Sequence, residues 1–294
     1  MHQPAAAPQD DILRTLIHWA EQQELVRAML LTSTRAIPNA PVDLLSDYDV
    51  VLVVEDIHPF YEDRRWLGDF GEVLVVYWDP IHPDLEYGID RTGNVTEYGK
   101  GLKIDFTLCP VELFHRMVQA PALPAELDAG YRILLDKDYL TDGMQAPTYT
   151  AYLPKPPINE VYQKLVNDFF SDVPYMAKCL WRGELLPAKW CLDYDMKHVH
   201  LRPMLEWKIG LDHGWSVPVG ALGKGLKKRL PPDLWMQLED TYAGAGVAEN
   251  WEALFRTIAL FRQVAVEVGE RLGYTYPHEL DGKVTAYAQE IKQR

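Results

Sequence analysis

The sequence predicts an α+β protein, with a β-sheet domain and flanking helices over residues 1–150 and an all-helical domain over residues 151–294. Three short runs of strand-forming residues, two of them rich in valine, lie in the first half. The second half shows helical spacing of apolar residues almost to its end. Residues 149–158 contain three prolines and indicate a linker between the two domains.

The individual elements follow from the same patterns. We expect strands at residues 47–54, 72–78 and 102–109, and a helix before them at residues 13–31, where apolar residues recur at helical spacing. In the second half we expect helices at residues 159–182, 185–210, 233–242, 249–272 and 281–292. Pro174 and Pro203 fall inside two of these helices and are expected to kink or break them.

The composition narrows the class of function. The net charge of −14 argues against a non-specific nucleic-acid binder, because affinity for phosphates comes from Lys and Arg, and it suits a cationic substrate. The three cysteines show no CxxC spacing, so we expect neither a disulfide framework nor a zinc site. Without a long apolar run or a signal pattern, we expect a cytoplasmic monomer or small homo-oligomer with no membrane partner.

The strongest chemical signal is a pair of carboxylates, Asp47 and Asp49, at the start of the first predicted strand. Because side chains alternate along a strand, both point the same way, and their charges repel unless a cation lies between them. Asp105 lies on the polar side of the third predicted strand and can join this pair if the two strands are neighbours. Three carboxylates and a nucleoside triphosphate can together hold Mg²⁺.

A short polar loop precedes the first predicted strand. Ser33, Thr34 and Arg35 lie about a dozen residues before Asp47. Hydroxyl and backbone N–H groups can donate to a triphosphate, and a guanidinium can neutralise its charge. Such a loop is also an ordinary turn, so its significance depends on its order and spacing relative to the aspartates.

This order of motifs resembles the nucleotidyltransferase superfamily, and more specifically the aminoglycoside 6-adenylyltransferases, also called streptomycin adenylyltransferases. The resemblance covers nearly the whole chain in order, through residues 47–60, 66–71, 103–110, 134–138, 153–156, 174–182, 204–210, 250–255 and 271–277. One position departs from the family pattern. The family loop usually reads Gly-Ser-Arg, and here Ser33 replaces the glycine, which bears on how closely the backbone can approach a phosphate.

The resemblance implies a nucleotidyltransferase-type mixed β-sheet domain joined to a helical substrate-binding domain. The implied reaction uses ATP and Mg²⁺ to transfer AMP to a hydroxyl of a streptomycin-like aminoglycoside, a polycation, and thereby inactivates the antibiotic. The residues implied to bind the metal and carry catalysis are Asp47, Asp49 and Asp105, and those implied to bind the nucleotide are Ser33, Thr34, Arg35 and Lys178.

Some assignments stay open at this point. Asp193 or Asp195 can serve as the general base for the acceptor hydroxyl, or either can be a solvated carboxylate on a helix. Lys178 can contact the triphosphate or lie on the surface. The alternative functions are a nucleotidyltransferase acting on another small-molecule or protein hydroxyl, and a non-catalytic nucleotide-binding relative. Three mutually repelling carboxylates argue against the non-catalytic alternative.

Overall fold

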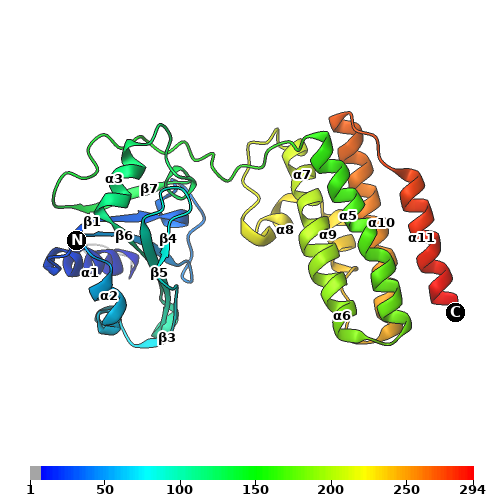
Figure 1. Ribbon diagram of the computed structural model, residues 1–294, viewed down its shortest axis with the longest axis horizontal. Helices are drawn as coiled ribbons and strands as arrows, with labels where there is room; N and C mark the ends of the chain where they lie inside the picture. Colours follow the sequence, from blue (N-terminus) through cyan, green and yellow to red (C-terminus); the bar gives the residue numbers. More distant parts are fainter. Residues whose placement is uncertain (1–7) are drawn as a thin grey trace, which may run out of the picture. The chain divides into compact units, whose positions relative to one another are not determined.

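The computed structural model describes residues 8–294, and the chain divides into two compact units between Ala151 and Tyr152 (Figure 1). Within the described residues, every strand lies in the first unit, and the second unit is helical. The expected α+β class is therefore confirmed. No helix in this part of the chain is both long and apolar enough to cross a membrane.

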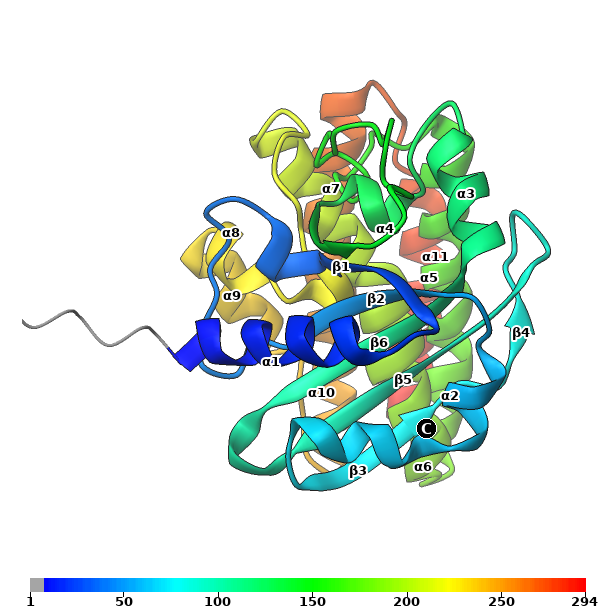
Figure 2. The same ribbon diagram turned by 90° about the vertical axis from the view of Figure 1, so that its left-hand side faces the viewer.

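The first unit is built on a mixed sheet with the strand order β3-β5-β6-β2-β1-β7, and β4 pairs with β5 (Figure 2). Only β2 and β6 pair in parallel, and the other neighbours are antiparallel. The strands are β1 (Val26–Thr32), β2 (Tyr48–Val54), β3 (Val73–Trp78), β4 (His82–Pro83), β5 (Asp90–Tyr98), β6 (Lys103–Pro110) and β7 (Tyr131–Asp136). The three predicted strands are thus confirmed as β2, β3 and β6.

Helices cover both faces of this sheet. Apolar side chains of one face, such as Leu52 and Phe106, pack with those of α1 and η2. Those of the other face, such as Val51 and Cys109, pack with α3. The helices and helical turns of this unit are α1 (Pro8–Gln22), η1 (Ser33–Ala36), α2 (His58–Glu62), η2 (Arg64–Phe70), η3 (Gly99–Gly101), α3 (Val111–Gln119) and α4 (Ala125–Asp128).

The prediction of one helix over residues 13–31 is wrong in its second half, because α1 ends at Gln22 and residues 26–32 form β1. This strand lies between β2 and β7, and six of its seven residues are buried. A segment that is apolar on both faces satisfies a helical pattern and a buried strand equally well. Pairing with two neighbouring strands decides in favour of the strand.

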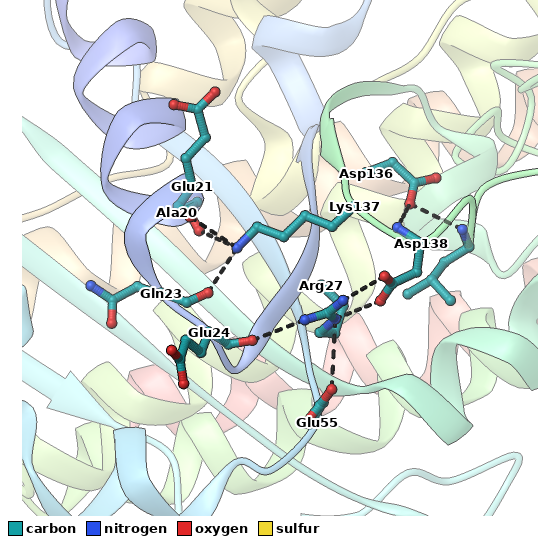
Figure 3. A network of polar contacts seen from close by, with 10 residues as sticks. Ala20, Glu21, Gln23, Glu24, Arg27, Glu55, Asp136, Lys137 and Asp138 are labelled. Carbon is teal, nitrogen blue, oxygen red and sulfur yellow. Dashed lines mark hydrogen bonds and ion pairs between the residues drawn. The ribbon is translucent and has the colours of Figure 1, made fainter.

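The side chain of Lys137 caps the C-terminal end of α1 (Figure 3). A helix leaves its last carbonyl groups without partners, and a cation there is favoured by the helix dipole. The Lys137 ammonium donates to three carbonyl oxygens at 2.8–3.2 Å, those of Ala20, Glu21 and Gln23. The adjacent Asp138 pairs with Arg27 of β1. Residues 134–138, one of the blocks that resemble the family, therefore fasten α1 to the sheet.

The second unit is a helical bundle in which α5 packs against α10 and α11 (Figure 1). Its core includes three phenylalanines, and Phe169 stacks on Phe261 with a ring-centroid distance of 3.7 Å. The helices are α5 (Asn159–Trp181), α6 (Leu185–Lys189), η4 (Trp190–Leu201), α7 (Arg202–Asp212), η5 (Ala221–Gly223), α8 (Leu226–Arg229), α9 (Pro232–Glu239), α10 (Val247–Leu272) and α11 (His278–Gln293). All five predicted helical regions are confirmed.

The two prolines do not break the helical segments that contain them. α5 runs through Pro174 without interruption. Pro203 lies in the first turn of α7, directly after the π-helical segment η4. A proline inside a continuous helical segment removes one backbone hydrogen bond, and Pro203 coincides with the change from π-helical to α-helical winding.

Candidate active site

Three aspartates from two neighbouring strands converge in the first unit. Asp49 of β2 and Asp105 of β6 are direct partners in the parallel register, and Asp47 directly precedes β2. Each of the three offers a carboxylate oxygen, and these oxygens lie within 4.8 Å of one another. The long separation in sequence is bridged because β6 pairs directly with β2. The structure thus assembles the carboxylate cluster that strand alternation predicts.

Lys103 lies between two of these carboxylates. Its ammonium donates to Asp47 Oδ2 and to Asp105 Oδ2, both at 2.8 Å. Partial burial disfavours its charged form, but the bonds to Asp105 and Asp47 prevail and raise the pKa of Lys103. One positive charge therefore neutralises part of a cluster that carries three negative charges when ionised.

Within the cluster, the pKa of Asp49 is more strongly shifted than that of Asp105. Burial, followed by the charges of Asp47 and Asp105, raises the pKa of Asp49 to about 6. A hydrogen bond from Ser33 and the charge of Lys103 act in the opposite direction. Burial also raises the pKa of Asp105, although Lys103 opposes this shift. Two partly buried acids therefore resist ionisation where the available positive charge is insufficient.

Two carboxylate oxygens of the cluster have no hydrogen-bond partner, namely Asp49 Oδ2 and Asp105 Oδ1. Both atoms are buried, so leaving them without partners costs free energy. A divalent cation bound to these oxygens would supply the missing contacts and offset the repulsion between the carboxylates. Hard cations such as Mg²⁺ prefer carboxylate oxygens, so the donor set fits this type of ion.

The polar loop lies beside the cluster as the 3₁₀ turn η1, and Ser33 is its first residue. The backbone of Ser33 has a φ of 58°, in the left-handed region that favours glycine. This conformation explains why the resembling family usually has glycine at this position. The serine side chain has its own contact here, because its hydroxyl forms a hydrogen bond with Asp49.

Arg35 supports the aspartate segment through the backbone. Its Nε donates to the carbonyl oxygen of Asp47 at 2.9 Å, and its Nη2 donates to that of Ser46 at 2.6 Å. The guanidinium also lies over the ring of Tyr48, 3.9 Å from its centroid. Arg35 thus fixes the chain where it enters β2, which sets the positions of Asp47 and Asp49.

The other sequence candidates lie in the second unit. Lys178 is exposed on α5. Asp193 of η4 forms ion pairs with Lys189 and Lys197, at 2.6 and 2.7 Å. Asp195 forms no ion pair within the described residues, and burial together with the charge of Asp172 raises its pKa.

Sequence reasoning did not assign a role to Lys103, although the signal was present. Lys103 and Asp105 are two positions apart on one strand, so their side chains share a face of the sheet. A lysine beside an acid on the polar side of a strand is a natural partner for that acid. The contact to Asp47, in contrast, depends on the pairing of two distant strands and is visible only in the structure.

The fold and the site together define a class of protein. The mixed sheet with three converging carboxylates fits a nucleotidyltransferase, and the family model and the named relatives show that the protein is an enzyme of this class. The chain belongs to the streptomycin adenylyltransferase family, whose model matches residues 8–291. The family resemblance expected from the motifs is therefore confirmed.

Individual relatives agree with this membership. The chain is 29% identical over 289 residues to an aminoglycoside 6-adenylyltransferase of Campylobacter jejuni, covering 97% of this chain and 96% of that protein. It is also 29% identical over 289 residues to the Bacillus subtilis enzyme of the same name, covering 96% and 97%. A crystal structure of an aminoglycoside 6-adenyltransferase from Bacillus subtilis is similar over 98% of this chain and 99% of that chain, with 25% identity and a TM-score of 0.44.

Proposed function

We propose that this enzyme transfers AMP from ATP to a hydroxyl of a streptomycin-like aminoglycoside and so inactivates the antibiotic. The observation that carries the proposal is the cluster of Asp47, Asp49 and Asp105, in a chain whose relatives are named aminoglycoside 6-adenylyltransferases. An acceptor that carries several positive charges also suits a protein with a net charge of −14. In this proposal residues 1–150 are the catalytic domain and residues 151–294 bind substrate.

The three aspartates are the residues that would hold Mg²⁺. When bound, this ion supplies positive charge that orients the phosphates and stabilises the charge that develops on them. Ionised Asp49 and Asp105 would offer it the two oxygens that lack hydrogen-bond partners. Lys103 keeps Asp47 and Asp105 close together, so little rearrangement of the protein is required on binding.

Residues around the cluster supply the contacts to the nucleotide in this proposal. Ser33 and Thr34 offer hydroxyl and backbone N–H donors at η1, next to Asp49. Arg35 adds positive charge near the phosphates while its backbone contacts hold the aspartate segment. Lys178 of the helical unit is proposed as a further contact to the triphosphate.

The acceptor hydroxyl must lose a proton as it attacks the α-phosphate of ATP and displaces pyrophosphate. Of the two candidates, Asp195 suits this role better than Asp193. The raised pKa of Asp195 brings it closer to neutral pH, and no ion pair within residues 8–294 holds its carboxylate. Asp193 is held between two lysine ammonium groups, which occupy both of its carboxylate oxygens. Because the reaction needs ATP, we propose that it takes place in the cytoplasm.

The proposal is tested by incubating the purified protein with ATP, Mg²⁺ and either streptomycin or kanamycin, and measuring the release of pyrophosphate. We expect release with streptomycin that requires the divalent ion. Release that depends on neither drug, or that appears only with an unrelated alcohol or a protein acceptor, would contradict the proposed substrate class. Release that is unaffected by removal of divalent ions would contradict the proposed role of the aspartates.

A further inference from the structure

The face of the sheet that carries the catalytic cluster continues towards the edge strand β3. Asp49 pairs with Asp105, Asp105 pairs with Val95 of β5, and Val95 pairs with Tyr77 of β3. Residues that are paired directly across strands point to the same side of a sheet. Neighbouring strands lie about 4.8 Å apart, so the backbone of Tyr77 is about 10 Å from that of Asp105.

This outer part of the face is apolar, aromatic and exposed. Tyr77 is 63% exposed and Val75 is 60% exposed. Val76 and Trp78 of β3 face the opposite way and pack into the core with side chains of α1 and η2. The edge strand therefore anchors one side in the core and presents an aromatic ring on the side that carries the aspartates.

Two residues near Tyr77 carry carboxylates without partners in the described part of the chain: Glu97 pairs with Val75, and Asp79 follows Tyr77 by two positions. Within residues 8–294, neither Glu97 of β5 nor Asp79 at the end of β3 forms a side-chain hydrogen bond or an ion pair. Glu97 is the direct partner of Lys103 across the strands. Burial is the main cause of the raised pKa of Asp105, and the negative charge of Glu97 adds to it. Glu97 therefore acts on the catalytic cluster without being neutralised itself.

A cavity of about 240 Å³ opens on the same face, and its lining includes Asp79, Gly93 and Thr107. Thr107 follows Asp105 by two positions on β6 and pairs with Gly93. Gly93 has no side chain to fill this space. A Cβ there would lie only 2.9 Å from the carbonyl oxygen of Phe106 and 3.8 Å from a carboxylate oxygen of Asp79. The Asp79 carboxylate thus lies over a flat part of the sheet beside the catalytic cluster.

We propose that Tyr77, Glu97 and Asp79 form the surface that binds the acceptor, a saccharide carrying ammonium or guanidinium groups. This inference rests on the proposed function. The Tyr77 ring would lie against the saccharide and interact with a cationic substituent through its π face. Glu97 and Asp79 would pair with further cationic groups and direct a hydroxyl towards Asp105. A neutral sugar of the same size would lack these ionic contacts.

The test measures the binding of streptomycin alone by titration calorimetry, so that it does not depend on turnover, and then the KM and kcat for transfer. The variants are Tyr77→Ala, Tyr77→Phe and Glu97→Gln. The matched controls are Tyr139→Ala, at a tyrosine 77% exposed in the same unit, and Glu62→Gln on α2. These residues lie outside the catalytic cluster, and the exposure of Tyr77 means that its replacement leaves the core intact.

We expect Tyr77→Ala and Glu97→Gln each to weaken drug binding about tenfold, equivalent to about 1.4 kcal/mol. The KM for the drug should rise accordingly. The drug affinity of Tyr77→Phe and of both controls, and the KM for ATP, should stay within twofold of the wild-type values. Wild-type turnover with unchanged drug affinity in both variants would overturn the acceptor surface and leave the proposed function standing. If the variants weaken drug binding but the wild type transfers no AMP, the result would support the acceptor surface and overturn the proposed function. A wild type that does not bind the drug would overturn both.

Discussion

Asp49 and Asp105 are direct partners across the only parallel strand pair of the described sheet, and each has one buried carboxylate oxygen without a hydrogen bond. Two acids in this arrangement destabilise the protein in the absence of a cation, because both burial and mutual repulsion disfavour their ionised forms. The pair therefore lowers the stability of the cation-free protein and gives the site an affinity for positive charge.

The first prediction concerns Asp49→Asn. This change removes a proposed metal ligand, and we expect it to lower kcat by about a hundredfold to a thousandfold, the magnitude for the loss of one electrostatic contact in a transition state. It also removes a repelling charge, so the variant should be at least as stable as the wild type in EDTA. Thermal unfolding and turnover are measured on the same preparations, with the exposed Asp142→Asn as the control. An active Asp49→Asn enzyme would refute the assignment of this ligand.

The second prediction concerns pH. Because the pKa of Asp49 is raised to about 6, this carboxyl becomes protonated and loses its affinity for cations as the pH falls through that value. Activity should therefore decline on the acid side near pH 6, and the decline should move to lower pH as the Mg²⁺ concentration rises, since the ion competes with the proton. Profiles of kcat/KM at two Mg²⁺ concentrations test this. An acid limb that does not move with Mg²⁺ would contradict the account.

The same pKa shift predicts how the stability of the metal-free protein depends on pH. The folded state binds the Asp49 proton more tightly than the unfolded state, in which the pKa is near 3.8. The stabilising contribution is therefore complete below about pH 3.8 and is lost as the pH rises through about 6. The free energy of unfolding in EDTA, measured by urea titration between pH 5 and 7.5, should show a loss that Asp49→Asn lacks. If the free energy of unfolding depended on pH with equal slopes in the two proteins, Asp49 would be excluded as the titrating group.

Sequence patterns alone were sufficient to predict the carboxylates of the site, because strand alternation is a local property. They were not sufficient for β1, whose residues are apolar on both faces and satisfy a helical pattern as well. They also missed β5 and β7. β5 contains Thr, Gly, Asn and Glu and is held as a strand by its partners β3 and β6. Long-range pairing thus decides what local composition leaves ambiguous.

The third prediction concerns Lys103→Met, which removes the only positive charge that the described structure places between Asp47 and Asp105. The metal-free variant should be less stable at pH 8, because three carboxylates then repel without a counter-charge. Mg²⁺ should restore this loss, so the rise in Tm on adding Mg²⁺ should be larger for the variant than for the wild type. An equal rise in both proteins would show that Lys103 and the divalent ion do not share the same carboxylates.

The fourth prediction compares Ser33→Gly with Ser33→Ala. Both remove the hydroxyl that forms a hydrogen bond with Asp49, so both should raise the pKa of Asp49 and move the acid limb of activity to higher pH by the same amount. Only glycine relieves the left-handed backbone at this position, where φ is 58°. We therefore expect Ser33→Gly to be more stable than Ser33→Ala by about 1 kcal/mol. Equal stabilities in urea denaturation would contradict the strained conformation.

The fifth prediction concerns Lys137, whose ammonium donates to three carbonyl oxygens at the end of α1. Lys137→Met keeps much of the side-chain volume and removes these bonds, so it should lower the free energy of unfolding by about 1.5–3 kcal/mol. The control is Lys164→Met, at a lysine whose ion pair is largely exposed and should matter little. The activity of the folded enzyme should remain unchanged. A stability loss no larger than that of the control would show that the contacts do not hold α1.

The central claim is that three carboxylates on neighbouring strands support the transfer of AMP to an aminoglycoside. The most direct measurement is the mass of streptomycin recovered after incubation with ATP, Mg²⁺ and either the wild-type protein or Asp49→Asn. We predict a product heavier by one AMP unit with the wild type and unmodified drug with the variant. Unmodified streptomycin from a wild-type preparation that is folded and binds Mg²⁺ and ATP would contradict the proposed acceptor, and modified drug from the variant would contradict the proposed site.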